Sequence, residues 1–340
     1  MKYLLLVFIS ISVISCNSAQ NSAVKNDSKI VTAVDYANTI TASELKEHLY
    51  IYAGDAMQGR MTGTKGQKLA SEYLRNFYQD NEISSPKGDS DYYQTIPASY
   101  FNRMTDPQES ENVVAFIKGS EKPDEIIVVS AHLDHVGVDK EGNIFNGADD
   151  DGSGTVALLE MAQAFQKAVK DGNGPKRSIL FLHVTGEEIG LFGSRYYTEN
   201  PIFPLENTVC NLNIDMIGRI APEKTENPNY IYLIGSDKLS QELHNLSEET
   251  NKKYTNLELD YTFNDDNDPN RFYYRSDHYN FAKNNIPVIF YFNGVHEDYH
   301  KHTDTPDKIE YELMAKRTQL VFYTAWEIAN REERITADKL

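Results

Sequence analysis

Short apolar segments that each lead directly into histidine or carboxylate residues constrain the fold of this chain more than any other feature. Segments 126–130, 179–184 and 209–214 are followed by AHLDH, TGEE and DMIG, and segment 287–292 is followed by the histidine-bearing stretch 293–302. Apolar runs of this length are typical of strands buried on both faces of a parallel sheet. Because ligands bind at the carboxyl ends of such strands, we expect these polar residues to gather at one edge of the sheet.

Strand-like and helix-like segments alternate through most of the chain. This predicts an α/β fold with a mostly parallel mixed sheet and helices on both faces. The expected strands span residues 112–117, 125–130, 178–184, 209–214, 230–234 and 287–292. The expected helices span residues 155–169, 236–251, 277–284 and 306–330. Residues 43–53 and 64–80 carry helical periodicity and predict an additional N-terminal helical layer, with Ser43 capping its first helix.

The first residues predict export. Lys2 precedes an apolar stretch, 3–14, that is too short to span a bilayer as a mature helix. Residues 13–16, Val-Ile-Ser-Cys, resemble the lipobox of bacterial lipoproteins. We therefore expect a lipoprotein signal peptide at 1–15 and a lipid anchor on Cys16. The absence of acidic residues just after Cys16 favours an outer-membrane anchor that faces the periplasm. An ordinary cleaved signal peptide is the alternative.

Composition divides the rest of the chain into three parts. Residues 16–40 are polar and rich in Ser and Asn, as in a tether. Residues 41–110 form the expected helical segment, which would pack on the core. Residues 111–335 form the main domain, with a loop insertion near 257–275, where the sequence NDDNDPN at 264–270 has the residue types of exposed turns.

The charge of the chain excludes some functions. It carries 33 Lys and Arg against 51 Asp and Glu, a formal net charge of −18. Such a surface repels phosphate backbones, so general binding to nucleic acid is not expected. Most of these acids are expected to be solvated, and only those at strand ends suggest chemistry.

The strand-end residues have the types and spacing of metal ligands and their partners. His132 and Asp134 would share one face of an extended segment, where a carboxylate commonly orients a metal-binding imidazole. Glu187 and Glu188 would allow one carboxylate to bind metal while the other acts as a general base. Asp215 follows an apolar strand, where a carboxylate is costly unless it is paired or bound to metal.

Two further segments add candidate ligands. The turn GADDDGSG at 147–154 holds three successive aspartates, which repel one another unless cations compensate them. His300 and His302 lie just before a helix that starts near Pro306, and only one of them is needed.

A calcium loop is an alternative interpretation of the aspartate turn. Its spacing fits an EF-hand loop that would use Asp149, Asp151, Ser153, Gly154 and Glu160. The residues before this turn, however, are rich in Gly and Asn and are not typical of the helix that an EF-hand requires. The residues after it are typical of a continuous helix that would remove the glutamate from the loop.

Taken together, five motifs resemble those of the co-catalytic dizinc peptidases of the MH clan. They are HLDH at 132–135, GADDDGSG at 147–154, TGEE at 185–188, NIDMIG at 213–218 and YHKHTDTPDK at 299–308. That family includes secreted bacterial aminopeptidases and glutamate carboxypeptidases. The resemblance covers residues 43–330 and implies the α/β fold of a zinc aminopeptidase, with 111–335 as the catalytic domain.

The resemblance also implies a ligand set for two Zn²⁺ ions per chain. One ion would be held by His132, Asp150 and Asp215, and the other by Asp150, Glu188 and His300. Asp150 would bridge the ions, and its bond to Asp151 would be a cis peptide. His300 is preferred over His302 because the family ligand follows an aromatic residue and precedes an aspartate by four positions.

Three more residues receive catalytic roles from the resemblance. Asp134 would orient His132, Glu187 would be the general base, and Tyr299 would donate a hydrogen bond to the tetrahedral oxyanion. The implied function is a zinc-dependent exopeptidase that cleaves peptides at their N-terminus through a hydroxide bridging the metals.

Other functions remain open. A carboxypeptidase or dipeptidase of the same fold would need Arg or Lys near the site, and Arg271 and Arg275 lie close to a family motif. Cyclases of the clan use one zinc and lack part of the ligand set. From another class, the chain would be a calcium-binding or inactive receptor-like module.

Overall fold

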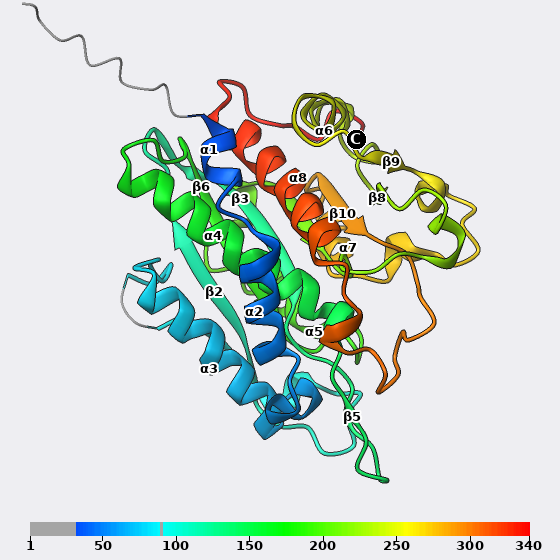
Figure 1. Cartoon of the computed structure of the whole chain (residues 1–340). Coiled ribbons are helices and arrows are strands. Elements are labelled where there is room, and N and C mark those ends of the chain that lie inside the picture. Colours follow the sequence, from blue (N-terminus) through cyan, green and yellow to red (C-terminus); the bar gives the residue numbers. More distant parts are fainter. Residues whose placement is uncertain (1–31, 89–90) are drawn as a thin grey trace, which may run out of the picture. The chain divides into compact units, whose positions relative to one another are not determined.

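The computed structural model describes residues 32–88 and 91–340, and the compact unit Thr32–Leu340 is considered by itself. Its centre is an eight-stranded sheet with the order β1-β2-β6-β3-β7-β10-β8-β9 (Figure 1). The strands, in that order, are Tyr93–Ile96, Ser110–Ile117, Arg177–Val184, Lys122–His132, Thr208–Ile214, Val288–Phe292, Tyr230–Ile234 and Glu258–Asp260. A separate hairpin consists of β4 (Gly137–Val138) and β5 (Ile144–Phe145).

The four central strands of the sheet run parallel. β6, β3, β7 and β10 are joined by parallel pairings, whereas β2 pairs with β6, and β8 with β10, in the antiparallel sense. In β3, Ile127 and Val129 belong to the hydrophobic core on one side of the sheet, and Ile126 and Val128 belong to the core on the other. This two-sided burial explains the continuous apolar runs in the sequence. The predicted mostly parallel mixed sheet is confirmed.

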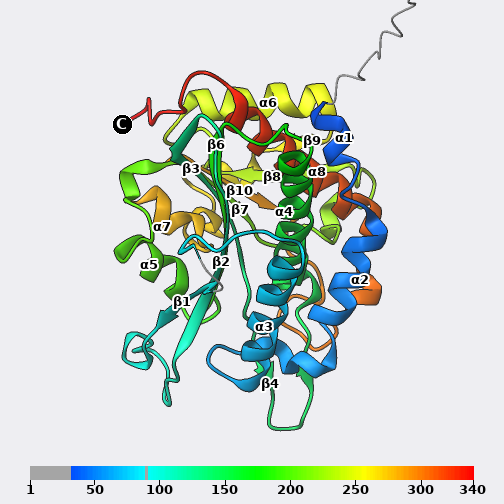
Figure 2. The same cartoon turned by 90° about the vertical axis from the view of Figure 1, so that its left-hand side faces the viewer.

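Helices cover both faces of this sheet. α1, α2, α3, α4 and α8 lie on one side, and α5 and α7 lie on the other (Figure 2). The helices α1 to α8 are Ala33–Ala37, Ala42–Tyr52, Lys65–Asp80, Gly154–Lys170, Phe192–Glu199, Gln241–Tyr254, His278–Ala282 and Tyr311–Asn330. α6 packs on α8, where the rings of Tyr254 and Tyr323 stack with centroids 4.0 Å apart. The predicted N-terminal helical layer is confirmed by α2 and α3.

Two predicted boundaries at the N-terminal side are wrong. Residues 33–40, assigned to the tether, form α1 and its following turn, and they pack on the domain with Tyr36 and Ile40 each 1% exposed. The cap of α2 is Thr41 rather than Ser43, because the Thr41 hydroxyl accepts a hydrogen bond from the backbone N–H of Glu44 at 3.2 Å. The signal peptide 1–15, Cys16 and the tether up to residue 31 lie outside the described residues.

The segment 257–275 is more ordered than the predicted loop insertion. It contains β9 and two short 3₁₀ turns, Thr262–Asn264 and Phe272–Tyr274. Phe272 is buried and its ring lies 5.0 Å from that of Phe292 in β10. The insertion therefore builds part of the wall beside the carboxyl ends of the strands.

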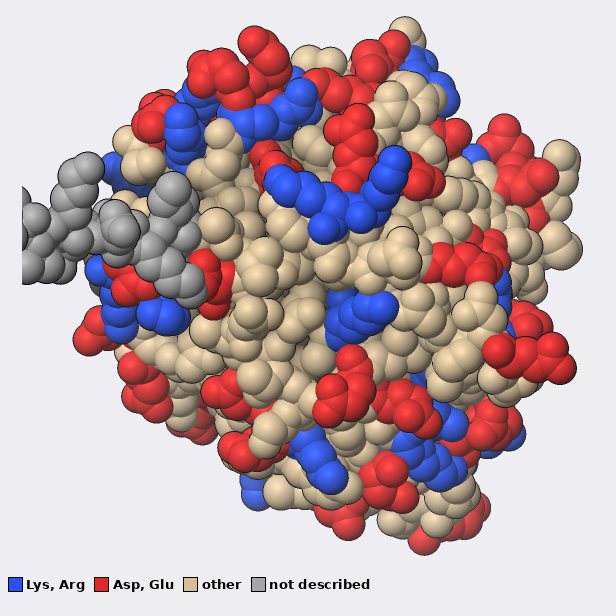
Figure 3. Space-filling view, turned by 45° about the horizontal axis from the view of Figure 1, so that its top comes forward, with Lys and Arg blue, Asp and Glu red and all other residues tan. Residues whose placement is uncertain are grey.

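The surface has a mixed charge on the face drawn in Figure 3. Acidic and basic side chains lie interspersed there and do not form a single patch. Among the described residues, no helix is long and apolar enough to cross a membrane.

Candidate metal centre

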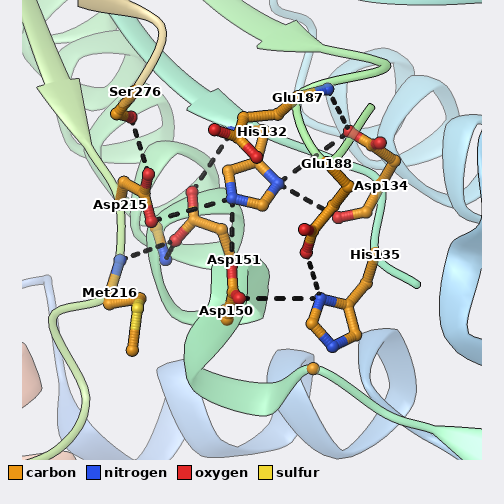
Figure 4. Close-up of polar contacts among 12 residues, drawn as sticks. His132, Asp134, His135, Asp150, Asp151, Glu187, Glu188, Asp215, Met216 and Ser276 are labelled. Atoms are coloured by element: carbon orange, nitrogen blue, oxygen red, sulfur yellow. Dashed lines mark hydrogen bonds and ion pairs between the residues drawn. The ribbon is translucent and has the colours of Figure 1, made fainter. Parts of the chain in front are cut away.

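Polar residues gather where the central parallel strands end. His132 is the last residue of β3, and Asp215 directly follows β7. Glu187 and Glu188 lie in the loop after β6, and parallel pairing brings the ends of β3, β6 and β7 to the same edge. The loop after β10 adds His300. Figure 4 shows the strand-end residues facing one another, so the predicted gathering at one edge of the sheet is confirmed.

Two groups of ligand atoms meet at one carboxylate. The first group contains His132, whose Nε2 lies 3.1 Å from Asp150 Oδ1 and 3.7 Å from Asp215 Oδ1. The second contains His300, whose Nε2 lies 3.1 Å from Asp150 Oδ2 and 3.1 Å from Glu188 Oε2. The two oxygens of Asp150 thus face different histidines, as a bridging ligand requires.

The contacts of these atoms fit a bound cation. His132 Nε2, Asp150 Oδ2 and Glu188 Oε1 are buried and accept or donate no hydrogen bond within the described part of the chain. In the same residues, no Lys or Arg forms an ion pair with Asp150, Glu188 or Asp215. Buried carboxylates without a cation are unfavourable, and imidazole with carboxylate is a donor set that Zn²⁺ accepts.

The histidine of the second group shows how negative this site is. Burial lowers the pKa of His300, but contacts with Asp150 and Glu188 outweigh this effect and raise that pKa to about 10. A proton on this imidazole occupies the position that a metal ion would take, because metal and proton compete for the same lone pair.

Of the three successive aspartates, only Asp150 faces both histidines. Asp149 accepts the N–H of Gly218 at 2.6 Å. Asp151 lies within metal-ligand reach of His132 and Asp215, but its two oxygens accept the backbone N–H groups of His132, Gly154 and Met216. Through these hydrogen bonds, Asp149 and Asp151 hold neighbouring backbone segments in place. The Asp150–Asp151 peptide is cis, as the resemblance implied.

Two residues outside the triplet fix this turn. The carboxylate of Asp304 accepts the N–H groups of Asp149 and Asp150 at 3.0 and 3.2 Å. Gly147 has a φ of +54°, and a Cβ there would lie 2.3 Å from the carbonyl oxygen of Asp150. The turn therefore requires glycine at this position.

The calcium-loop interpretation is wrong. Glu160, its proposed last ligand, lies within α4, with Oε1 3.4 Å from Nε2 of His48 on α2. The residues before the turn form the β4–β5 hairpin instead of a helix. Asp149 and Asp151 already accept backbone hydrogen bonds, so these residues do not form an EF-hand.

The role predicted for the carboxylate of Asp134 needs correction. Nδ1 of His132 lies 3.1 Å from the backbone carbonyl oxygen of Asp134, whereas the carboxylate is 3.9 Å away. A carbonyl only accepts, so Nδ1 carries the hydrogen and Nε2 keeps its lone pair for the site. The Asp134 carboxylate instead accepts the Thr62 hydroxyl at 2.8 Å and the backbone N–H of Glu187 at 3.2 Å. It thereby fixes the loop that carries Glu187.

Glu187 and Tyr299 line an open cavity next to both groups of ligands, which we call the rim cavity. Burial, with the nearby Glu188 and Asp215 carboxylates, raises the pKa of Glu187 well above its usual range. Burial also raises the pKa of Tyr299, whose ring stacks on His300 with centroids 3.9 Å apart. The tyrosine hydroxyl therefore stays protonated and available as a donor.

Sequence reasoning missed two residues that touch the candidate ligands. His135 is buried, and its Nδ1 lies 2.7 Å from Glu188 Oε1. Its place in the HLDH motif was the available signal. The hydroxyl of Ser276 donates to Asp215 Oδ2 at 2.6 Å, and only the fold brings these two together. His302, by contrast, is exposed and lies against Phe145.

Comparisons with known proteins relate this chain to peptidases. The sequence profile of peptidase family M28 matches residues 112–325. Aminopeptidase NAALADL1 of Rattus norvegicus is 33% identical over 133 residues, which are 38% of this chain and 17% of that protein. A probable glutamate carboxypeptidase LAMP1 of Arabidopsis thaliana is 36% identical over 106 residues, 31% of this chain and 14% of that protein. The chain thus spans less than a fifth of the length of either relative.

The fold also matches solved structures. BSAP, a zinc aminopeptidase from Bacillus subtilis, superposes with a TM-score of 0.65 at 17% sequence identity, covering 88% of this chain and 98% of that chain. This likeness covers more of the chain than the residues 112–325 that the family profile matches.

Proposed function

This chain belongs to peptidase family M28, and we propose that it is a zinc-dependent exopeptidase that removes residues from the N-terminus of peptides. The observation that carries this proposal is the gathering of four ligand side chains, those of His132, Asp215, Glu188 and His300, around a fifth, Asp150, beside a cavity that Glu187 also lines. No member of the ligand set implied by the resemblance is missing, which argues against an inactive receptor-like module.

We propose two zinc ions per chain. His132, Asp150 and Asp215 would hold one, and Asp150, Glu188 and His300 would hold the other. When bound, zinc polarises the scissile carbonyl and lowers the pKa of water.

Glu187 would move the proton during hydrolysis. Its carboxylate would take a proton from the attacking water as the oxygen bonds to the scissile carbon. It would return that proton to the leaving nitrogen as the C–N bond breaks. A pKa raised by burial suits a base that must also act as an acid near neutral pH. The Tyr299 hydroxyl would donate to the oxyanion.

The carboxylate of Glu187 favours a substrate with a free α-amine. Glu187 lines the rim cavity and is not one of the proposed zinc ligands, so its charge can attract an ammonium group. The rat relative is named an aminopeptidase, which supports the same choice. A carboxypeptidase or dipeptidase is the alternative, supported by the name of the plant relative and by Arg275 in the cavity.

An assay with purified, zinc-loaded protein tests the proposal. Aminoacyl p-nitroanilides and matched N-acetylated dipeptides would be compared, with and without a chelator. We expect chelator-sensitive cleavage of the substrates with a free amine. Cleavage of only the acetylated dipeptides would support the carboxypeptidase alternative, and no cleavage of either would contradict an exopeptidase.

We also propose export and a lipid anchor on Cys16, supported by the Val-Ile-Ser-Cys sequence at 13–16. The anchor would lie in the outer membrane and face the periplasm. Cell fractionation tests it: a Cys16→Ser variant should move from the membrane fraction to the soluble fraction. Equal membrane association of both proteins would contradict the anchor.

A further inference from the structure

One cation in the rim cavity has no assigned partner. Arg275 lines this cavity beside Asp150, Glu187 and Asp215, and it is the only basic residue among the described residues that do so. Its side chain is exposed and forms no ion pair or hydrogen bond within the described part of the chain. Its guanidinium lies over the Phe272 ring, 5.0 Å from the ring centroid.

Two other arginines of this domain, Arg219 and Arg317, are held by ion pairs or hydrogen bonds. Arg219, which lies near the same edge of the sheet, contacts Asp298 at 3.0 Å and Glu297 at 3.2 Å. The buried Arg317 donates to the carbonyl oxygens of Ile217 and Arg219. Unlike these two, Arg275 keeps its fork of donors free although carboxylates line the same cavity.

The Phe272 ring explains why the Arg275 guanidinium does not pair with the carboxylates of the same cavity. A guanidinium held over an aromatic face is favourably placed and keeps its N–H donors in the plane of the fork for a second ligand. When divalent cations compensate the charges of the ligand carboxylates, these carboxylates no longer offset the positive charge of Arg275, which lines the same cavity. The cavity then presents Glu187 for an ammonium group and Arg275 for an anion.

We propose that Arg275 binds a carboxylate of the substrate, on the residue that follows the scissile bond. This inference rests on the proposed exopeptidase function and names its substrate class: short peptides with a carboxylate at that position, above all dipeptides with a free C-terminus. The opposite charges of a dipeptide match the two charged groups of the cavity, and the apolar walls formed by Phe290, Phe292 and Met216 suit an uncharged side chain between them.

The test compares Leu-Phe with its C-terminal amide, Leu-Phe-NH₂, on the zinc-loaded protein. We expect kcat/KM for the free acid to exceed that for the amide by about tenfold or more, since charge-assisted hydrogen bonds are among the stronger ones. Arg275→Gln should remove this preference, mainly through KM for the acid, and leave the amide within about twofold. Arg275→Lys should restore only part of it, because lysine keeps the charge but lacks the bidentate fork.

Arg271→Gln is the matched control. Arg271 lies four residues earlier on the same segment, stacks on Tyr274 at 4.8 Å and does not line the rim cavity. It should leave both substrates unaffected. A second pair, Leu-Glu-NH₂ and Leu-Gln-NH₂, identifies the source of the carboxylate. A preference for Glu that depends on Arg275 would assign the contact to a side chain instead of the C-terminus.

Calorimetric titration of the same ligands separates this inference from the proposed function. If neither dipeptide is cleaved, the exopeptidase proposal fails. Tighter binding of the acid than of the amide, lost in Arg275→Gln, would still support the carboxylate contact. Equal binding and equal turnover of acid and amide in the unsubstituted protein, or equal effects of Arg275→Gln on both, would overturn it.

Discussion

His132 and His300 are both candidate zinc ligands, but the fold holds them in different ways. His132 ends a central strand and is 1% exposed, and the Thr155 hydroxyl donates to its backbone carbonyl at 2.8 Å. His300 lies on the loop after β10, has a φ of +54° and keeps 41% of its side chain exposed. The two halves of the proposed centre therefore share Asp150 but differ in how much structure surrounds them.

The supporting contacts follow the same division. In the His132 half, Asp215 directly follows a strand and is held by Ser276. In the His300 half, Glu188 lies in a loop and its partner is His135. Ligands that are ordered before a metal binds lose less entropy when it does. The sheet therefore holds the ligands of the His132 half in place, whereas the His300 half depends on loops.

The largest expected effect is a loss of turnover that leaves zinc binding in both halves unchanged. Glu187→Gln should lower kcat by about 10²- to 10⁴-fold, because it removes the general base while keeping the shape of the side chain. Both zinc ions should remain, as measured by elemental analysis of the dialysed protein. Glu188→Gln is the matched control, which should lose the zinc of the His300 half. Turnover at the unsubstituted rate in Glu187→Gln would contradict the assigned base.

Removing one histidine at a time tests whether the two halves differ in zinc affinity. His300→Ala should lose the zinc of its half and retain the other ion, because His132 and Asp215 stay in place. His132→Ala should lose the better-prepared half. Zinc titration followed by calorimetry should show two affinities in the unsubstituted protein, and only the tighter one in His300→Ala. Equal affinities for both halves would contradict the difference in how well the two halves are ordered before zinc binds.

Partners of the ligands should each affect one half. Ser276→Ala removes the donor to Asp215, and His135→Gln changes the partner of Glu188. Loss of such a contact typically weakens metal binding by about 10- to 100-fold. We expect each variant to weaken zinc binding in its own half only, in the same titration. If both variants weakened the same half, the division of supporting residues would be wrong.

The fold was predictable where burial leaves a strong pattern. The central strands are covered on both faces, so their sequences are apolar without interruption, and their predicted ranges agree with the structure to within a few residues. The edge strands β1 and β9, of four and three residues, have no such pattern and were missed. α1 was also missed because only its packing explains it: the Tyr36 ring lies 5.4 Å from Trp326 on α8.

The candidate site was predictable to the level of residues, but not of atoms. The resemblance to the dizinc peptidases selected Asp150 from three adjacent aspartates, and only this one faces both histidines. The sequence did not reveal that His132 contacts the carbonyl of Asp134 and not its carboxylate, since that depends on the backbone of the turn. The free state of Arg275 depends on every neighbour that does not pair with it, and no sequence pattern records this.

The smallest effect concerns His183, a buried histidine of β6 that lies outside the centre. Burial lowers its pKa to about 3, and its Nε2 lies 2.6 Å from the Tyr78 hydroxyl. No carboxylate among the described residues forms an ion pair with His183, whereas Nε2 of His132 lies 3.1 Å from Asp150 Oδ1. If contacts with carboxylates rather than burial mark a ligand, His183→Gln should retain both zinc ions and change only stability.

Between about pH 6.5 and pH 3 the unfolded chain binds a proton on His183 that the folded chain does not. The free energy of unfolding must then fall as pH falls, by up to about 1.4 kcal/mol per pH unit from this residue. His183→Gln removes that contribution, so its urea-unfolding free energy should fall less steeply between pH 6.5 and 5 than that of the unsubstituted protein. Parallel pH dependences would show that His183 does not stay neutral when folded, and zinc loss in this variant would remove the distinction between the site and the buried interior.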